Sequence, residues 1–247
     1  MIIKYLLILG IGHLFGDFYF QNEKIAEYKE VKYQGVLLHS IEYCAAFLLT
    51  ILPVFSIDMV IAVVYAALAH FLIDTVKYFI LLKKKVRKNF NIFIVDQCAH
   101  IVSIFVLAYT MDCWHFTIGQ VKCVSDILSA FHCNAETIGR WILALLAIHT
   151  PANIFIQKFL GEYKPKKDED IIKMDNKAGR RIGTLERFIM LIFLSKDQFT
   201  ALGFVLTAKS IARYDKITKD EKFAEYYLRG TLVSTLYVII CRVLIWV

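Results

Sequence analysis

The sequence predicts an all-α protein, a polytopic bundle of six or seven transmembrane helices, and three observations support this class. The first is composition: 58% of the 247 residues are hydrophobic and 21% are charged, whereas soluble domains have about 45–50% and 25%. The second is that the charged residues gather in short runs between long uncharged stretches. The third is the length of those stretches, which matches the ~20 residues that cross a bilayer. Together they exclude a soluble enzyme, a disordered chain and a coiled coil.

Six stretches are long and apolar enough to be spans. The first, Ile2–Phe20, is too long for the apolar core of a signal peptide and carries His13 and Asp17. Every span must be helical, because lipid offers the backbone no hydrogen-bond partner. The other five are Val36–Phe55, Ile57–Leu82, Ile92–Thr110, Thr137–Leu160 and Tyr226–Val247.

The charges of the loops predict the orientation of the chain. Lys83–Asn91 contains five basic residues and no acid, and Lys158–Arg187 contains nine basic residues. Met111–Glu136 contains one Lys or Arg residue, Lys122. Because cytoplasmic loops carry an excess of Lys and Arg, we expect the first two loops to face the cytoplasm and the third to face outward. The net charge of +7 then reflects orientation, and the expected partners are membrane lipids and not nucleic acid.

A seventh apolar region, Leu185–Ala208, is interrupted at its centre by Ser195–Gln198. Both of its flanks are basic, so a single span would place the second flank outside, whereas a re-entrant pair of half-helices keeps both flanks inside. Both alternatives stay open, and we favour the re-entrant one. We expect one membrane domain over residues 1–247, with a five-helix part (1–160) and a second part (161–247) of basic linker, interrupted helix and last span.

Ionisable residues inside the predicted spans need an explanation, since each costs about 2.5–3.5 kcal/mol on insertion. His13 and Asp17, His70 and Asp74, and Asp96 and His100 are spaced four residues apart, which places each pair on one helix face. From the helical rise of about 1.5 Å per residue, the carboxylates form a layer near the cytoplasmic ends of the spans. The imidazoles form a layer about one turn deeper.

This pattern predicts a divalent metal, with zinc as the first choice, because imidazole and carboxylate are both good zinc ligands. A metal with an open position lowers the pKa of its bound water to about 7, and Asp17 or Asp74 is then a candidate general base. We expect Lys77 and Gln97 to orient the reacting groups. The predicted ligands are His13, Asp17, His70, Asp74, Asp96 and His100.

The function that this chemistry favours is a metal-dependent intramembrane hydrolase. Its substrate would be lipid-linked or phosphorylated and would enter from the cytoplasmic leaflet. Two alternatives stay open. The same residues are suited to relay charge in a proton- or ion-coupled transporter, or they form a structural polar network that fixes helix packing in a non-enzymatic protein.

Two weaker patterns lie outside the spans. Basic residues around the interrupted region form a candidate phosphate clamp, because guanidinium groups suit phosphate oxygens; anchoring to anionic headgroups is the alternative that we favour. Cys113, Cys123 and Cys133 of the outer loop are compatible with one disulfide, or with a small zinc site that includes His115 and His132. The clamp residues are Arg180, Arg181, Arg187, Lys209 and Arg213.

The spans also carry a family resemblance. His13–Gln21, His70–Asp74 with Lys77, and Asp96-Gln97 with His100 resemble the motifs of the family called domain of unknown function 3307. The resemblance implies a bacterial or phage-borne protein of the inner membrane, with no assigned reaction. The motifs are also distantly similar to those of membrane-bound metal-dependent hydrolases. The C-terminal half resembles longer members of the family at Gly179–Arg187, Ala208–Arg213, Glu225–Tyr227 and Gly230–Leu232.

Overall fold

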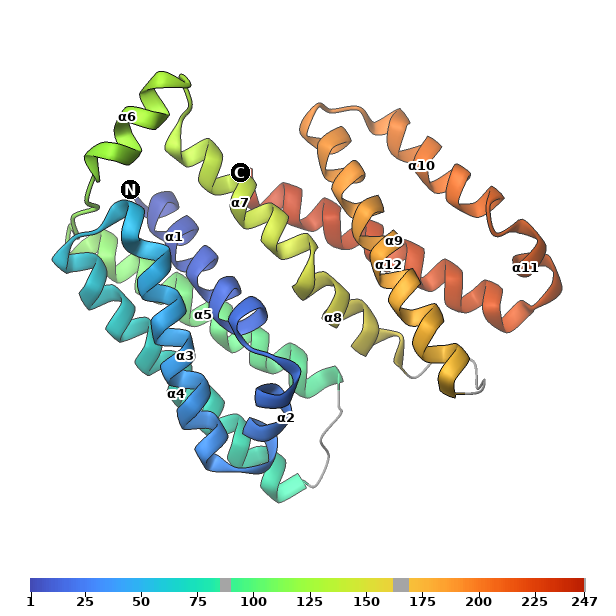
Figure 1. Cartoon of the computed structure of the whole chain (residues 1–247), viewed down its shortest axis with the longest axis horizontal. Coiled ribbons are helices and arrows are strands. Elements are labelled where there is room, and N and C mark those ends of the chain that lie inside the picture. The colour runs from blue at the N-terminus through green and yellow to red at the C-terminus, as the bar shows by residue number, and fades with distance from the viewer. Residues whose placement is uncertain (85–89, 162–168, 247) are drawn as a thin grey trace. The chain divides into compact units, whose positions relative to one another are not determined.

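The computed structural model describes residues 1–84, 90–161 and 169–246 (Figure 1). In these ranges all regular structure is helical, and six helices are long and apolar enough to cross a membrane. The prediction of an all-α polytopic bundle is therefore confirmed, and the chain is a multi-pass membrane protein. The basic loop predicted at Lys83–Asn91 and the start of the linker after Leu160 fall largely outside the described residues.

The chain divides into two compact units, Met1–Leu143 and Ala144–Val247, and each is described by itself. In the N-terminal unit four helices form a closed ring, because α1 contacts α3 and α5, and α4 also contacts α3 and α5. The ring helices are α1 (Ile2–Leu14), α3 (Tyr33–Ile51), α4 (Ile57–Lys84) and α5 (Phe90–Cys113), with the short elements η1 (Phe15–Phe20), α2 (Glu23–Val31), η2 (Leu52–Val54), α6 (Lys122–Ala130) and the start of α7 (Ala135–Ile148) between and after them.

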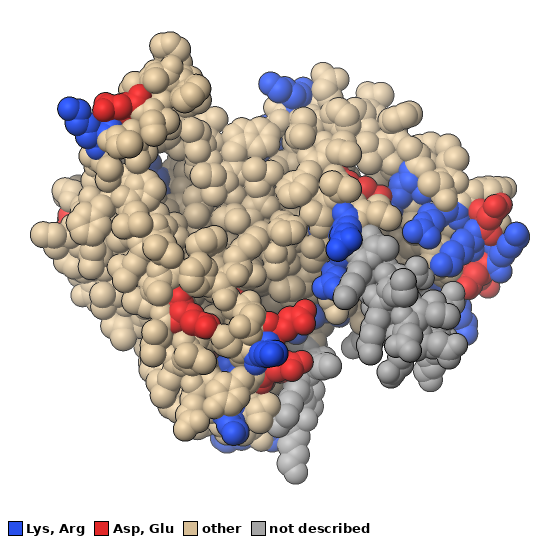
Figure 2. All heavy atoms as spheres, in the orientation of Figure 1, with Lys and Arg blue, Asp and Glu red and all other residues tan. Residues whose placement is uncertain are grey.

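The outer surface of this unit is apolar along the helices. Leu68, Leu72 and Val76 follow one face of α4 and are each more than half exposed, which suits a helix face in contact with lipid. On the face seen in Figure 2, most charged side chains of the unit lie near α6 and around α2, and one acidic patch lies over α3. This distribution is the one that a bilayer-spanning bundle requires.

Two glycines let α1 and η1 approach α3 closely. A Cβ atom on Gly12 would lie 2.5 Å from the ring of Phe47, and one on Gly16 would lie 2.7 Å from the ring of Tyr43. Small residues four apart are a common device of packed membrane helices, because they bring two backbones together. Toward the N-terminus of α1 the interior becomes wholly apolar, with Tyr5, Leu9, Phe47, Ile51, Met59 and Met111 buried together.

Three helices end in the same way, on a residue with a left-handed backbone. His115, His132 and Asp197 have φ of 53°, 50° and 55°. After α5, the His115 N–H donates to Asp112 O and the Phe116 N–H to Met111 O, and the other two ends repeat this pattern. It is the Schellman motif, which satisfies the last carbonyl groups of a helix.

In the C-terminal unit, α12 (Glu221–Ile245) contacts three other helices, α8, α9 and α11. The fifth span predicted from the sequence, Thr137–Leu160, is not one straight helix. α7 ends at Ile148 and α8 starts at Thr150, and Pro151 follows the break. Proline removes a backbone donor and crowds the preceding turn, so it kinks a helix. The elements of the unit after α7 are α8 (Thr150–Phe159), α9 (Glu169–Ser195), α10 (Phe199–Ile211), α11 (Tyr214–Lys219) and α12.

The interrupted region is a helical hairpin. α9 ends at Ser195, and the Gln198 N–H donates to Phe193 O across a turn in which Asp197 is left-handed. α10 then packs back against α9. The region is therefore not a continuous helix across residues 185–208, which agrees with two half-helices. Its position in the membrane stays a prediction.

Arg187 links the kink to the rest of this unit. Its side chain is 2% exposed, and its Nε donates to Ile148 O at 2.6 Å, directly beside the break. Nη2 donates to Asn153 Oδ1 at 2.6 Å and to Thr184 Oγ1 at 3.1 Å, and Nη1 donates to Ser234 Oγ at 3.3 Å. One guanidinium thus joins α7, α8, α9 and α12.

We expect Arg187→Met to destabilise the protein, because the Ile148 carbonyl loses the guanidinium donor and Asn153 Oδ1 keeps only the Thr184 hydroxyl at 3.4 Å. A buried polar group left without a partner costs about 1–3 kcal/mol. Thermal unfolding in detergent measures the effect, and Arg181→Met, at an exposed position of the same helix, is the matched control. Equal midpoints for the two variants would contradict the assigned role of Arg187.

Candidate metal centre

The ring of the N-terminal unit brings all six predicted ligands together in its interior. His13, Asp17, His70, Asp74, Asp96 and His100 are between 1% and 8% exposed. The first two come from α1 and η1, the next two from α4 and the last two from α5. Their spacing of four residues puts each pair on the inner face of its helix.

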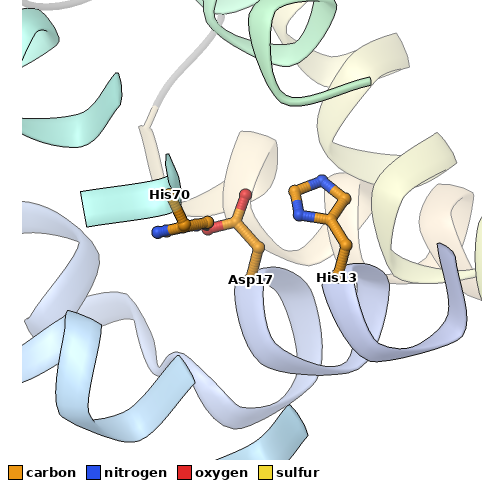
Figure 3. Close-up of side chains that lie close together, drawn as sticks. All are labelled: His13, Asp17 and His70. Atoms are coloured by element: carbon orange, nitrogen blue, oxygen red, sulfur yellow. Dashed lines mark ion pairs between the residues drawn. The ribbon is translucent and has the colours of Figure 1, made fainter. Parts of the chain in front are cut away.

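The potential ligand atoms form three overlapping groups. In each group, one nitrogen or oxygen atom per residue lies within 4.8 Å of those of the other two. Figure 3 shows the first group, in which the carboxylate of Asp17 lies between the rings of His13 and His70. The groups are His13, Asp17 and His70; His39, His70 and Asp74; and Asp74, Asp96 and His100. Such groups of imidazole and carboxylate can hold a divalent metal ion.

Asp17 is presented by a π-helical segment. The first helix changes from α-helix to π-helix at Phe15 and remains so to Phe20. π-Helical turns are rare and occur often at functional sites, because the wider turn re-aims a side chain. This irregularity therefore marks the turn that carries the first carboxylate of the cluster.

Several ligand atoms of the cluster are buried and have no hydrogen-bond partner. A buried polar atom without a partner costs about 1–3 kcal/mol. A group of such atoms in one place therefore needs a common explanation. A bound cation would coordinate nitrogen and oxygen lone pairs of this kind. The atoms are Nε2 of His13, Nδ1 of His39, both ring nitrogens of His70, Oδ1 of Asp74, Oδ1 of Asp96 and Nε2 of His100.

Other contacts hold the imidazole rings in place. His100 Nδ1 lies 2.8 Å from the backbone oxygen of Asp96, and a proton donated there leaves the lone pair on Nε2. Tyr43 stacks on His70 with ring centroids 3.8 Å apart, and its hydroxyl is 3.4 Å from Nδ1 of His13. Metal-binding histidines are usually oriented by such second contacts, which fix the tautomer.

Two lysines and one amide neutralise or bridge the carboxylates. Lys77 Nζ lies 2.8 Å from Asp96 Oδ2, and Gln97 Nε2 donates to Asp17 Oδ2 at 3.4 Å and to Asp96 Oδ2 at 3.3 Å. Both residues therefore lie where orienting groups were expected. The second lysine, Lys29, donates to Asp74 Oδ2 at 3.0 Å and to Asp17 Oδ1 at 3.5 Å.

Lys29 was missed by the analysis of the sequence, because it lies in the short amphipathic α2 and not in a span. Gly35 allows the start of α3 to contact the backbone of α2, since a Cβ on Gly35 would lie 2.6 Å from the backbone nitrogen of Lys29. The side chain is thereby turned into the bundle. Burial by itself lowers the pKa of Lys29, but the carboxylates of Asp17 and Asp74 outweigh it and raise the pKa above its usual value.

His39 is a further member of the cluster and is fully buried. Its Nε2 lies 3.1 Å from Asp17 Oδ1, and it completes the middle ligand group. The sequence contained a weak signal for it, namely a histidine within the second span. No histidine or aspartate lies four residues from His39 in the sequence, so the spacing pattern that predicted the other six ligands does not include it.

The other predicted site residues lie in the C-terminal unit or in the outer loop. Arg187 is enclosed in the network beside the kink, and Lys209 Nζ pairs with Glu186 Oε2 at 2.6 Å. Arg180, Arg181 and Arg213 are exposed, and phosphate binding by these three and Lys209 stays a prediction. Arg187 is wrong as a clamp residue, because its buried guanidinium donates to acceptors inside the protein. Cys113, Cys123 and Cys133 are exposed free thiols, so the disulfide considered for the outer loop is not formed. Among the described residues, no group of potential metal ligands includes a cysteine, His115 or His132, so the zinc site considered there is not formed either.

The fold and the cluster define a class, a multi-pass helical membrane protein with a buried His/Asp site. Residues 5–127 match the model of the family described as a protein of unknown function (DUF3307). The N-terminal unit, which carries the cluster, therefore belongs to this family. No curated protein and no solved structure matches the chain. The resemblance of the C-terminal motifs to longer members lies beyond the matched residues and stays a prediction.

We expect Gly16→Ala to disturb the cluster, because the new Cβ would lie 2.7 Å from the Tyr43 ring that stacks on His70. Overpacking of this kind costs about 1–3 kcal/mol. The midpoint of thermal unfolding and the metal content would both decrease. The matched control is Gly203→Ala in α10, where a Cβ meets nothing within 4 Å; an equal response of the two variants would contradict the assigned packing.

Proposed function

We propose that this protein is a metal-dependent intramembrane hydrolase that acts on a lipid-linked or phosphorylated substrate from the cytoplasmic leaflet of a bacterial inner membrane. One observation carries the proposal: unpaired ligand atoms of buried histidines and aspartates converge from α3, α4, α5 and the first helix. Zinc fits this donor set best, because it accepts both imidazole and carboxylate in groups of three with an open position.

The chemistry follows from the donor set. A divalent ion held by three protein ligands supplies a nucleophile at neutral pH by lowering the pKa of bound water to about 7. Asp74 keeps Oδ1 without a hydrogen-bond partner while Oδ2 accepts from Lys29. Asp74 is therefore our preferred general base, with Asp17 as the second candidate, because its two oxygens already accept from His39, Lys29 and Gln97.

The substrate class follows from charge and position. Lys29 and Lys77 lie beside the carboxylates, and α2 lies between the first two spans on the side that the loop charges assign to the cytoplasm. The two ammonium groups offer an anionic headgroup from this leaflet cationic partners beside the carboxylates. The Gln97 amide donates to both Asp17 and Asp96 and would orient these two side chains.

A purely structural network explains the cluster less well. Polar residues that fix helix packing do so by pairing with one another, as Arg187 does with its four acceptor atoms. In the His/Asp cluster, by contrast, a ligand atom is left without a hydrogen bond on His13, His70, Asp74, Asp96 and His100. A packing role alone would leave their cost uncompensated.

Metal analysis of the purified protein tests the centre. We expect the wild type to contain a divalent metal, and His70→Asn and His100→Asn each to contain less metal than the wild type, because each removes a ligand nitrogen from the cluster. His132→Asn is the matched control, since this histidine is exposed and left-handed and asparagine tolerates that conformation. Elemental analysis by mass spectrometry measures the content. A metal-free wild type whose thermal stability is unchanged in Asp74→Asn would contradict the proposal.

Hydrolysis is tested on vesicles of phosphatidic acid and phosphatidylglycerol, with ³¹P NMR of the products. We expect Asp74→Asn to lower the rate by about 10²–10⁴-fold, the usual contribution of a general base, and His132→Asn to leave it unchanged. Ion or proton flux through proteoliposomes without hydrolysis, abolished by the same Asp74→Asn, would favour the transporter instead.

A further inference from the structure

We propose that the cluster holds two divalent cations side by side, which together bind the phosphate group of the substrate. This inference rests on the proposed function and narrows its substrate to a phosphorylated one. The first cation position is formed by His13, Asp17 and His70, and the second by Asp74, Asp96 and His100, with one ligand atom from each residue. One carboxylate oxygen of Asp74 would then bind the cation, and the other would stay available for the general base.

The first argument is the division of the ligands. The two groups have no residue in common, and each contains three donors within 4.8 Å of one another. Three protein ligands are enough for one cation with open positions. A single ion would use one group and leave the unpaired atoms of the other, either His13 Nε2 or the pair of His100 Nε2 and Asp96 Oδ1, without a partner.

The second argument is the proximity of the two positions. The rings of His70 and His100, one from each group, have centroids 4.5 Å apart, and those of His13 and His100 are 5.2 Å apart. The middle group, formed with His39, takes His70 from the first group and Asp74 from the second. The positions are therefore adjacent, as in two-metal sites, whose ions lie about 3.5–4 Å apart.

The third argument is the set of bridges between the two groups. Lys29 donates to Asp17 of the first group and to Asp74 of the second. Gln97 likewise donates to Asp17 and to Asp96. Each bridge holds a carboxylate of one group at a set distance from a carboxylate of the other, which is what a paired centre requires of its surroundings.

Charge then selects the substrate. Three carboxylates face the two ammonium groups of Lys29 and Lys77, so the formal charge is 2 − 3 = −1. Two divalent cations raise it to +3, which a buried site does not tolerate without an anion. A phosphate dianion offsets most of that charge and has enough oxygens to contact both ions, whereas a carboxylic ester or an amide brings no charge.

The experiment loads the full-length protein in detergent with Mn²⁺, in the presence of inorganic phosphate, and follows it by electron paramagnetic resonance. We expect two ions per chain and the multiline spectrum of an exchange-coupled pair. His13→Asn and His100→Asn should each reduce the content to one ion and remove the coupling. His132→Asn should retain both ions and the multiline spectrum.

Phosphate binding gives a second readout. We expect ³¹P relaxation to show inorganic phosphate within contact of Mn²⁺ in the wild type, with at least tenfold weaker binding in His13→Asn. If that variant does not fold, the spectrum of the wild type decides. One uncoupled ion per wild-type chain would overturn the paired centre and leave the hydrolase standing, whereas no bound ion would overturn both.

Discussion

The constraint on which the N-terminal unit depends is the burial of three carboxylates inside a bundle that spans a membrane. Each charge is costly there unless it is paired. Lys77 pairs with Asp96, and Lys29 with Asp74 and Asp17. These pairs leave the formal charge negative and several ligand atoms unpaired. A cation therefore completes the site electrostatically and chemically, and helix packing, loop placement and proposed function all follow from that requirement.

Two departures from regular helix in the described residues, one in each unit, lie beside buried polar groups. The π-helical turn at Phe15–Phe20 carries Asp17, and Gly16 within it makes room for Tyr43, which orients His70. In the other unit the break at His149 frees the Ile148 carbonyl that Arg187 binds. In lipid a backbone group released by a kink must find a partner inside the protein, so the irregularities and the buried polar side chains depend on one another.

The two buried polar networks differ in a way that separates structure from chemistry. Around Arg187 the acceptors are neutral oxygens of Asn153, Thr184, Ser234 and Ile148, and every one of them is paired. Around Asp17 and Asp74 the atoms suited to bind a metal are those left over. The first network explains itself as a link between helices. The second requires something more, which is the physical basis for the proposed metal centre and for a phosphorylated substrate.

The spans and six cluster residues were predictable from the sequence alone. Lipid requires helical spans, most charged residues fall in the loops between them, and a spacing of four residues defines one helix face whatever the neighbours are. The role of Lys29, the place of His39, the π-helical turn and the enclosure of Arg187 were not predictable. Each depends on which helix faces which, for instance on Gly35 bringing α2 against α3. Local pattern thus determined which residues point inward, and only the packing of the helices decided which of them meet.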